Sequence, residues 1–283
     1  MDDRLRPLWD FDDLETTEGR LRAQLDAEPL DEGRAEVLTQ LARLCGLRGD
    51  FDAGDALLDE ASTLGRGSRI VAARVDLERG RLRRSSGDPG TARPLFESAY
   101  ASAFQEHQHF VAVDAAHMVA LAATDGDDMV TWTQRGIDLA ERHEAASYWL
   151  GPLLNNLGWE YYESGDLAHA LDAFERGLRA RERDADNAAA IEIARYAVGK
   201  TLRALGRADD AIPLLERAVA WAEACNAPDG WFHEELAEEY AAIGRPDEAR
   251  GHARLAIPLL ETADPSFAED AERAARLRAL TGE

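Results

Sequence analysis

The sequence predicts an all-α fold, a right-handed α-solenoid of about six helix-turn-helix units with a capping helix at each end. Three observations predict it. Apolar residues recur at helical spacing along most of the 283 residues. A set of small residues returns in the same order at intervals of about 40 residues. A glycine follows the first helix of each repeat, where it would end that helix.

The clearest repeat covers residues 154–178. Residues 154–161 carry apolar or small side chains at positions i, i+3, i+4 and i+7, which form one stripe of an α-helix. Residues 164–166 read Ser-Gly-Asp and supply a turn, because glycine readily adopts the left-handed conformation that ends a helix. Residues 170–177 then place small and aromatic side chains on the stripe of a second helix. The segment therefore predicts two helices joined by a tight turn.

The same positions recur in five copies. The turn glycine is Gly49, Gly87, Gly165, Gly206 and Gly244. Seven residues before it stands a small residue: Ala42, Gly80, Gly158, Gly199 and Ala237. Five residues after it stands another: Gly54, Ala92, Ala170, Ala211 and Ala249. Two helices approach closely only where one side chain is small, so these positions predict the contact inside each hairpin.

A sixth unit is expected between Gly87 and Gly165, because the interval fits two repeats. In this unit the five repeat positions are occupied by His117, Thr124, Met129, Thr133 and Gly136. Of these, only the last, Gly136, fits the pattern of the other units. We still predict a helical hairpin there, because Val113, His117, Ala120 and Leu121 trace one face of a helix.

The two ends have the composition of capping helices. Asp12 to Asp26 is amphipathic, and so is Phe267 to Leu280. A solenoid needs end elements with a polar outer face, because every unit buries its apolar side on a neighbour. We therefore expect one continuous solenoid domain, with an N-terminal cap in 1–34, the superhelix in 35–262 and a C-terminal cap in 263–283.

The repeat resembles a known family. Leu157-Gly158, Tyr161, Ala170, Phe174 and Gly177 are similar to the signature of the tetratricopeptide repeat (TPR), a helix-turn-helix unit of about 34 residues. The longer spacing here is similar to the long-helix repeats of kinesin light chains and their bacterial relatives. The pattern departs from the family at Cys45 and Arg83, where an aromatic residue is usual. The resemblance implies a protein that binds peptides or proteins.

Charge and composition narrow the function. The chain has 55 acidic and 32 basic side chains, a net charge of -23. Nucleic acids and anionic membranes are bound by positive surfaces, so neither is an expected partner. Two cysteines provide no disulfide framework. The first six residues lack the pattern of a signal peptide, and no apolar run approaches the roughly 20 residues that cross a bilayer. We expect a cytoplasmic protein.

No catalytic or metal-binding constellation stands out. Gly199-Lys200-Thr201 lacks the earlier glycine of a phosphate-binding loop, because Ala194 stands in its place. The histidines His107, His109 and His117 are more typical of an interhelix loop and a helix face than of a metal site. We therefore predict no cofactor and no metal.

One stripe of side chains predicts a partner-binding surface. In the clearest repeat it consists of Asn155, Asn156, Trp159 and Tyr162, where a solvated face would carry charges. Amides offer a peptide backbone both a donor and an acceptor, and tryptophan and tyrosine are frequent binding hot spots. The following units contribute Tyr196, Lys200, Arg203, Trp231 and Glu235. Lys200, the only lysine, is expected to hold an acidic side chain or a terminal carboxylate. By analogy, the TPR resemblance implies the same for Asn156.

The leading hypothesis is a non-enzymatic adaptor that holds a protein or peptide segment in a groove lined by the first helices. One alternative is an intracellular sensor whose superhelix changes pitch when it takes up a signalling peptide. A less favoured one is a small-molecule enzyme that uses Asp114 and His117, three residues apart on one helix face. A homo-oligomer is compatible with all three.

The proposed surface has a structural alternative, in which Trp159 and Tyr162 only pack against adjacent helices. Arg195 and His233 lie nearer the core stripe, so they are expected to make contacts between helices. The remaining charges, which alternate in sign along the first helices, are expected to be solvated surface.

Overall fold

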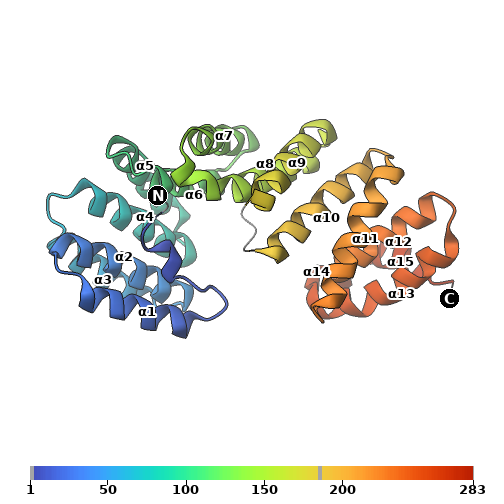
Figure 1. The fold of residues 1–283 in the computed structure, drawn as a ribbon, viewed down its shortest axis with the longest axis horizontal. Coiled ribbons are helices and arrows are strands. Elements are labelled where there is room, and N and C mark those ends of the chain that lie inside the picture. The colour runs from blue at the N-terminus through green and yellow to red at the C-terminus, as the bar shows by residue number, and fades with distance from the viewer. Residues whose placement is uncertain (1–2, 184–186, 283) are drawn as a thin grey trace. The chain divides into compact units, whose positions relative to one another are not determined.

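The computed structural model describes residues 3–183 and 187–282, and every regular element in these ranges is a helix (Figure 1). Two short 3-10 helices, η1 (Arg6–Leu8) and η2 (Glu144–Trp149), accompany the α-helices. The α-helices are α1 (Leu14–Ala27), α2 (Asp31–Leu47), α3 (Phe51–Leu64), α4 (Arg69–Ser85), α5 (Pro89–Gln105), α6 (His109–Leu121), α7 (Gly126–Arg142), α8 (Leu150–Glu163), α9 (Leu167–Arg183), α10 (Ala188–Ala204), α11 (Ala208–Ala224), α12 (Gly230–Ala242), α13 (Pro246–Ala263), α14 (Pro265–Glu269) and α15 (Ala271–Leu280).

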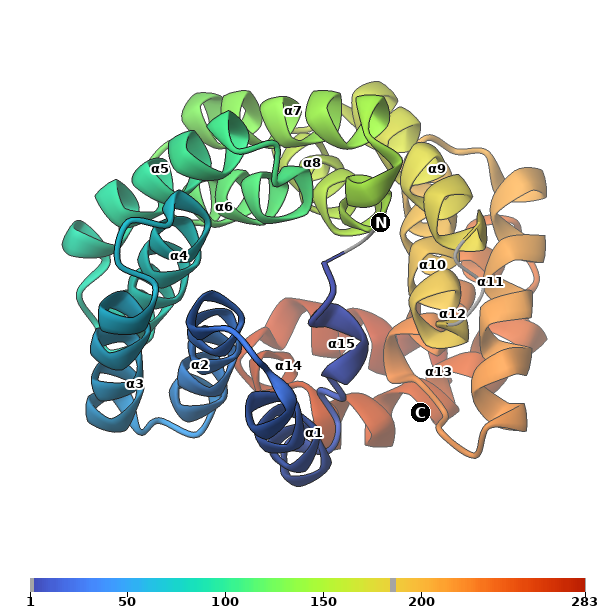
Figure 2. The same cartoon turned by 60° about the vertical axis from the view of Figure 1, so that its left-hand side comes forward.

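Within the described ranges, six helical hairpins run from α2/α3 to α12/α13. The predicted all-α solenoid of about six helix-turn-helix units is confirmed. Contacts group the chain into two compact units, Met1–Leu153 (unit 1) and Leu154–Glu283 (unit 2). In unit 1, α2, α4 and α6 form one row and α3, α5 and α7 a second row outside it (Figure 2). We call the surface of the first row, and that of α8, α10 and α12 in unit 2, the first-helix face of each unit.

Glycine ends the first helix of five hairpins. The five predicted turn glycines all have left-handed backbones, with φ of 79° at Gly49, 91° at Gly87, 82° at Gly165, 71° at Gly206 and 76° at Gly244. A side chain at such a position costs roughly 1–2 kcal/mol, because its Cβ crowds the following carbonyl oxygen. The turn prediction is therefore confirmed at each of these positions.

The third hairpin, α6/α7, forms without a turn glycine. Thr124, predicted at that position, does not have a left-handed backbone. Instead, the carboxylate of Asp125 accepts a hydrogen bond from the backbone N–H of Asp128 and caps α7. The second helix keeps the repeat pattern, because Thr133 is 1% exposed and Gly136 lies against Leu153.

The two ends differ in how well the sequence predicts them. Helix α1 lies where the first cap is predicted, and α2 begins at Asp31, so the boundary predicted at residue 34 falls inside a helix. The prediction of one helix over 267–280 is wrong. Two helices, α14 and α15, meet at Asp270, whose carboxylate accepts a hydrogen bond from the Arg273 N–H at 2.9 Å and starts α15. An N-cap of this kind interrupts a helix that the apolar spacing alone would continue.

The small residue of each hairpin gives a stability prediction. A Cβ added at Gly158 would lie 2.5 Å from the ring of Phe174, which is 2% exposed. We therefore expect Gly158→Ala to lower the free energy of unfolding by about 1–3 kcal/mol, as overpacked cores do. The matched control is Gly251→Ala, also within a helix, where a Cβ would meet nothing within 4 Å. It should raise stability by about 0.5–1 kcal/mol through helix propensity. Denaturant titration measures both, and equal effects would contradict the packing argument.

Candidate partner-binding surface

Four charged side chains link α10 to α12 on the first-helix face of unit 2. Both carboxylate oxygens of Glu235 are occupied: one accepts from the Lys200 ammonium, and the other from Arg203 Nε at 2.6 Å. Arg203 also pairs with Glu238 at 3.0 Å. The Glu235 side chain is only 2% exposed, whereas Lys200 and Arg203 keep 22% and 24%. Burial disfavours the charge of Arg203, but Glu235 and Glu238 outweigh it and raise the pKa of the guanidinium above its usual value.

These contacts change the interpretation of Lys200. The structure brings Lys200 together with Arg203 and Glu235, which were predicted for the same surface. The charge of Lys200, however, is already neutralised inside the molecule. An acidic ligand would have to compete with a buried carboxylate for the ammonium group. We infer that Lys200 and Glu235 hold α10 against α12, and that the binding groups of this surface are its neighbours.

The aromatic residues divide into core and partly exposed members. Tyr196 is 9% exposed and its ring lies 5.3 Å from that of Phe232, so it is a packing residue in this structure. Trp159 is half-buried, and its ring meets Phe174 edge to face at 5.0 Å and Tyr162 at 5.6 Å. Trp231 is also half-buried, against the core residues around it. Trp159 and Tyr162 therefore pack on adjacent helices and still remain partly exposed.

The two asparagines beside them have unused hydrogen-bonding capacity. Asn155 and Asn156 are half-buried, and Asn155 Nδ2 lies 3.5 Å from Asn156 Oδ1, at the limit of a hydrogen bond. Among the described residues, this is the one hydrogen bond of either side chain. Each amide carries two donor hydrogens and an acceptor oxygen, so most of this capacity remains for a partner.

Most of the alternating charges of the first helices are not solvated surface, so the prediction is wrong for them; Arg84 is exposed, as predicted. The others form ion pairs with neighbouring helices of the stack. In unit 1, Arg81 of α4 pairs with Asp114 of α6, and both side chains are at most 13% exposed. In unit 2, Glu234 of α12 pairs with Arg273 of α15 at 2.5 Å. Charged residues that alternate in sign from helix to helix are thus cross-links of the stack.

The predicted contacts of Arg195 and His233 between helices are confirmed. Arg195 of α10 pairs with Glu182 of α9 at 2.8 Å. His233 of α12 places its Nδ1 2.9 Å from the Nδ1 of His252 of α13, so one of these nitrogens carries a proton and the other accepts it. Burial, and next to it the neighbouring His252, lowers the pKa of His233 to about 4.

This pKa gives a pH prediction. An unfolded chain protonates His233 below about pH 6.5, whereas the folded chain does so only near pH 4, so stability should fall as the pH drops between these values. The loss from this one group should approach about 3 kcal/mol. We expect His233→Gln to flatten that part of the stability profile, measured by denaturant titration between about pH 7 and pH 4. An unchanged profile would show that His233 titrates normally.

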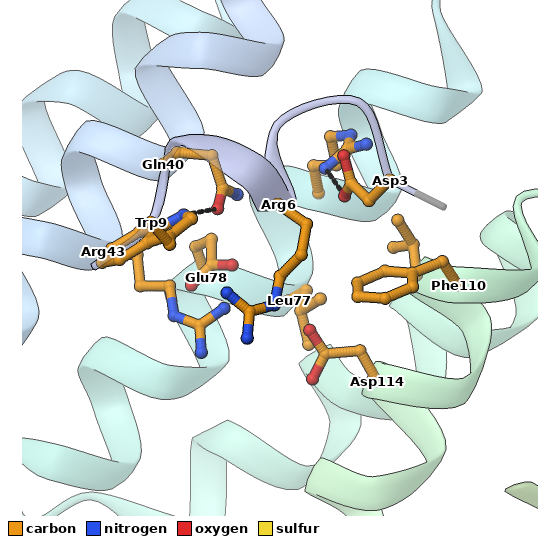
Figure 3. A pocket seen from close by; sticks show the side chains of 11 residues that line it. Asp3, Arg6, Trp9, Gln40, Arg43, Leu77, Glu78, Phe110 and Asp114 are labelled. Atoms are coloured by element: carbon orange, nitrogen blue, oxygen red, sulfur yellow. Dashed lines mark hydrogen bonds and ion pairs between the residues drawn. The ribbon is translucent and has the colours of Figure 1, made fainter. Parts of the chain in front are cut away.

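In unit 1, the first-helix face is covered by the chain's own residues 3–13, here called the strap. The carboxylate of Asp3 accepts from Arg74 of α4 at 2.7 Å, and the indole N–H of Trp9 donates to Gln40 of α2 at 2.9 Å (Figure 3). Leu5, between them, is 1% exposed. The strap could not be predicted from the sequence, because its one regular element, the three-residue 3-10 helix η1, is too short to show a periodicity. The apolar residues before α1 were the only available signal.

Asp114 and His117, the pair of the enzymatic alternative, do not work together in this structure. The carboxylate of Asp114 is engaged by Arg81. His117 Nδ1 is buried without a hydrogen-bond partner, and burial lowers the pKa of this imidazole to about 4. A base that a carboxylate orients needs a hydrogen bond between the two groups. The described residues contain no group of three or more His, Cys, Asp or Glu side chains placed to hold a metal ion.

The repeated hairpins, turn glycines and small contact residues define a helical-repeat protein. Two segments of the sequence, residues 153–183 and residues 193–225, each match a sequence model of the tetratricopeptide repeat. The chain contains tetratricopeptide repeats. No curated protein matches the sequence. None of the described helices is both long and apolar enough to cross a membrane.

Solved structures share the fold at low sequence identity. The apo form of RapI is 13% identical with a TM-score of 0.72, over 95% of this chain and 76% of that one. A signal transduction ATPase with a tetratricopeptide-repeat sensor, from Pyrococcus horikoshii, is 13% identical with a TM-score of 0.73, over 95% of this chain but 42% of that one. BtubC (BKLC) from P. vanneervenii is 17% identical with a TM-score of 0.61, over 80% and 93%.

Proposed function

We propose that the chain is a non-enzymatic cytoplasmic adaptor that binds a peptide or protein segment on the first-helix face of unit 2. The observation that carries the proposal is the group formed by Asn155, Asn156, Trp159 and Tyr162. It offers two half-buried amides with spare hydrogen-bonding groups beside two partly exposed aromatic rings. In a chain with 31% charged residues, an uncharged patch of this kind favours contact with a partner over contact with water.

The neighbouring helices give this patch a rigid base. Lys200, Arg203 and Glu235 fix α10 to α12, and Trp159 packs on Phe174 of α9. A surface that is already ordered loses little entropy when it binds. Affinity would come from burial of the aromatic rings, and orientation from the amides of Asn155 and Asn156. Lys200 and Arg203 are neutralised by Glu235 and Glu238, so the amides and the aromatic rings beside them, and not these cations, would select the segment.

Comparative affinity capture tests this function. The wild type, an Asn155→Ala/Asn156→Ala variant and a Trp132→Ala variant are used as baits in the source organism's cytosol. Trp132 is the matched control, because it is a half-buried tryptophan on α7, outside the first-helix face. We expect partners retained by the wild type and the Trp132 variant to be lost from the asparagine variant. Equal retention by all three would place the partner elsewhere and reject the proposed surface.

A sensor is the second candidate function. The Pyrococcus protein, which shares this fold over most of the chain, uses tetratricopeptide repeats as a sensor. In the same role, this chain would respond to a signalling peptide with a change in superhelix pitch. Small-angle scattering with and without a bound peptide separates the two functions. A sensor should change its radius of gyration on binding, whereas an adaptor should keep it.

A further inference from the structure

A cavity of about 190 Å³ lies in unit 1 among the C-terminal halves of three first helices. Its lining comes from α2, α4 and α6: Arg43, Gly46, Leu47, Arg81, Leu82, Arg84, Ser85 and Met118. An engineered protein cavity of about 150 Å³ accepts a benzene ring, so this space has room for a small organic molecule.

The charge of the lining is opposite to that of the chain. Three arginines and no acidic residue line the cavity, although acidic residues outnumber basic ones by 55 to 32 in the sequence. Arg81 is neutralised by Glu78 at 2.5 Å and by Asp114. Neither Arg43 nor Arg84 makes an ion pair within the part of the chain that the structure describes. Two guanidinium groups of the cavity therefore have no direct ion pair among the described residues.

Arg43 also lies close to two aromatic rings of the strap. Its guanidinium lies over the rings of Trp9 and Phe11 in the strap, at 5.2 and 5.4 Å from their centroids. Figure 3 shows Arg43 beside Trp9 at the edge of the strap. Burial, followed by the charge of Arg81, lowers the pKa of Arg43, although the nearby carboxylates of Glu78 and Asp114 act in the opposite direction.

The other part of the lining is apolar. Leu82 is 1% exposed and Met118 is 7% exposed, and Gly46 adds no side chain that would fill the space. The site thus combines two arginines without a direct ion pair with an apolar wall, which suits a ligand that has one anionic end and one apolar end.

We propose that this cavity binds a small organic carboxylate with a compact apolar body. The carboxylate accepts hydrogen bonds from Arg43 and Arg84, and the body packs against Leu82 and Met118. A single negative charge is favoured over a polyanion, because the net charge of -23 repels highly charged ligands from the protein as a whole. This site lies in unit 1 and is independent of the peptide surface proposed for unit 2.

Calorimetric titration of the full chain tests the proposal with three probes: benzoate, the neutral benzyl alcohol and inorganic phosphate. We expect benzoate to bind, with both other probes at least tenfold weaker. Arg43→Gln should weaken benzoate binding at least tenfold, because it removes the bidentate donor. Arg20→Gln is the matched control, since it makes the same charge change at an exposed position of unit 1 and should bind as the wild type does.

Arg84→Gln is a second variant that should fold normally, because Arg84 is exposed and makes no ion pair among the described residues. A loss of binding in this variant therefore cannot be attributed to a folding defect. Arg84→Gln should weaken benzoate binding several-fold while the circular dichroism spectrum stays unchanged. The proposal is overturned if wild type does not bind benzoate, if benzyl alcohol or phosphate binds equally well, or if both arginine variants bind benzoate like the wild type.

Discussion

Replacing Glu235 by alanine is expected to lower the free energy of unfolding by about 3 kcal/mol. The reason is that Glu235 is a nearly buried carboxylate whose two oxygens neutralise Lys200 and Arg203. Its removal leaves two cations side by side, less than a quarter exposed and without their shared counter-ion. Denaturant titration gives the total loss, and amide hydrogen exchange in α10 and α12 should show that it is concentrated there.

A triple variant provides the control. Lys200→Met/Arg203→Met/Glu235→Leu removes all three charges and replaces them with apolar groups of similar size. Buried ion pairs replaced in this way often lose little or no stability, so the triple variant should recover most of the loss. If Glu235→Ala changes stability by less than about 0.5 kcal/mol, the cluster behaves as a solvated surface salt bridge and does not hold the helices together.

Replacing Trp159 by alanine is expected to weaken partner binding by about 2 kcal/mol or more, roughly a thirtyfold increase in Kd. From the sequence alone, Trp159→Ala would be expected to leave the free energy of unfolding nearly unchanged. The structure predicts a stability loss as well, because the indole packs edge to face on Phe174. Binding must therefore be measured by titration at a temperature where circular dichroism shows the variant to be folded.

Trp159→Phe separates the two effects. A phenyl ring retains the contact with Phe174 but presents less surface and no indole N–H to a partner. We expect Trp159→Phe to be nearly as stable as the wild type and still to bind several-fold more weakly. If stability and binding instead fall in proportion in both variants, Trp159 is a core residue and the structural alternative is correct.

The features that sequence analysis could predict are those with a steric cause. Gly165 and Gly206 must adopt a left-handed backbone, and Gly158 must admit the ring of Phe174, so few residue types fit and the pattern repeats. The break at Asp270 could not be predicted with the same confidence, because an aspartate within an amphipathic stretch is equally compatible with a solvated helix position.

The ion pairs between first helices could not be predicted from the sequence for a different reason. Lys200 and Glu235 are 35 residues apart, and nothing in the sequence pairs the only lysine with this glutamate among the 55 acidic residues. Only the stacking of α10 on α12 brings them together and buries the carboxylate. The strap is a similar case, since Asp3 and Arg74 are 71 positions apart and meet only after α1, α2, α3 and α4 have folded.

Site-specific photo-crosslinking tests the proposed surface most directly. A benzophenone amino acid is placed at Tyr162, on the first-helix face of unit 2, and in a second sample at Trp132 on α7. After irradiation in cytosol, mass spectrometry identifies the attached segment. We predict that residue 162 captures one defined stretch of one partner and loses it when Asn155 and Asn156 are alanine, while residue 132 does not capture it. Capture from residue 132 alone, or of the same partner from both positions, would contradict a binding site on α8 and α10.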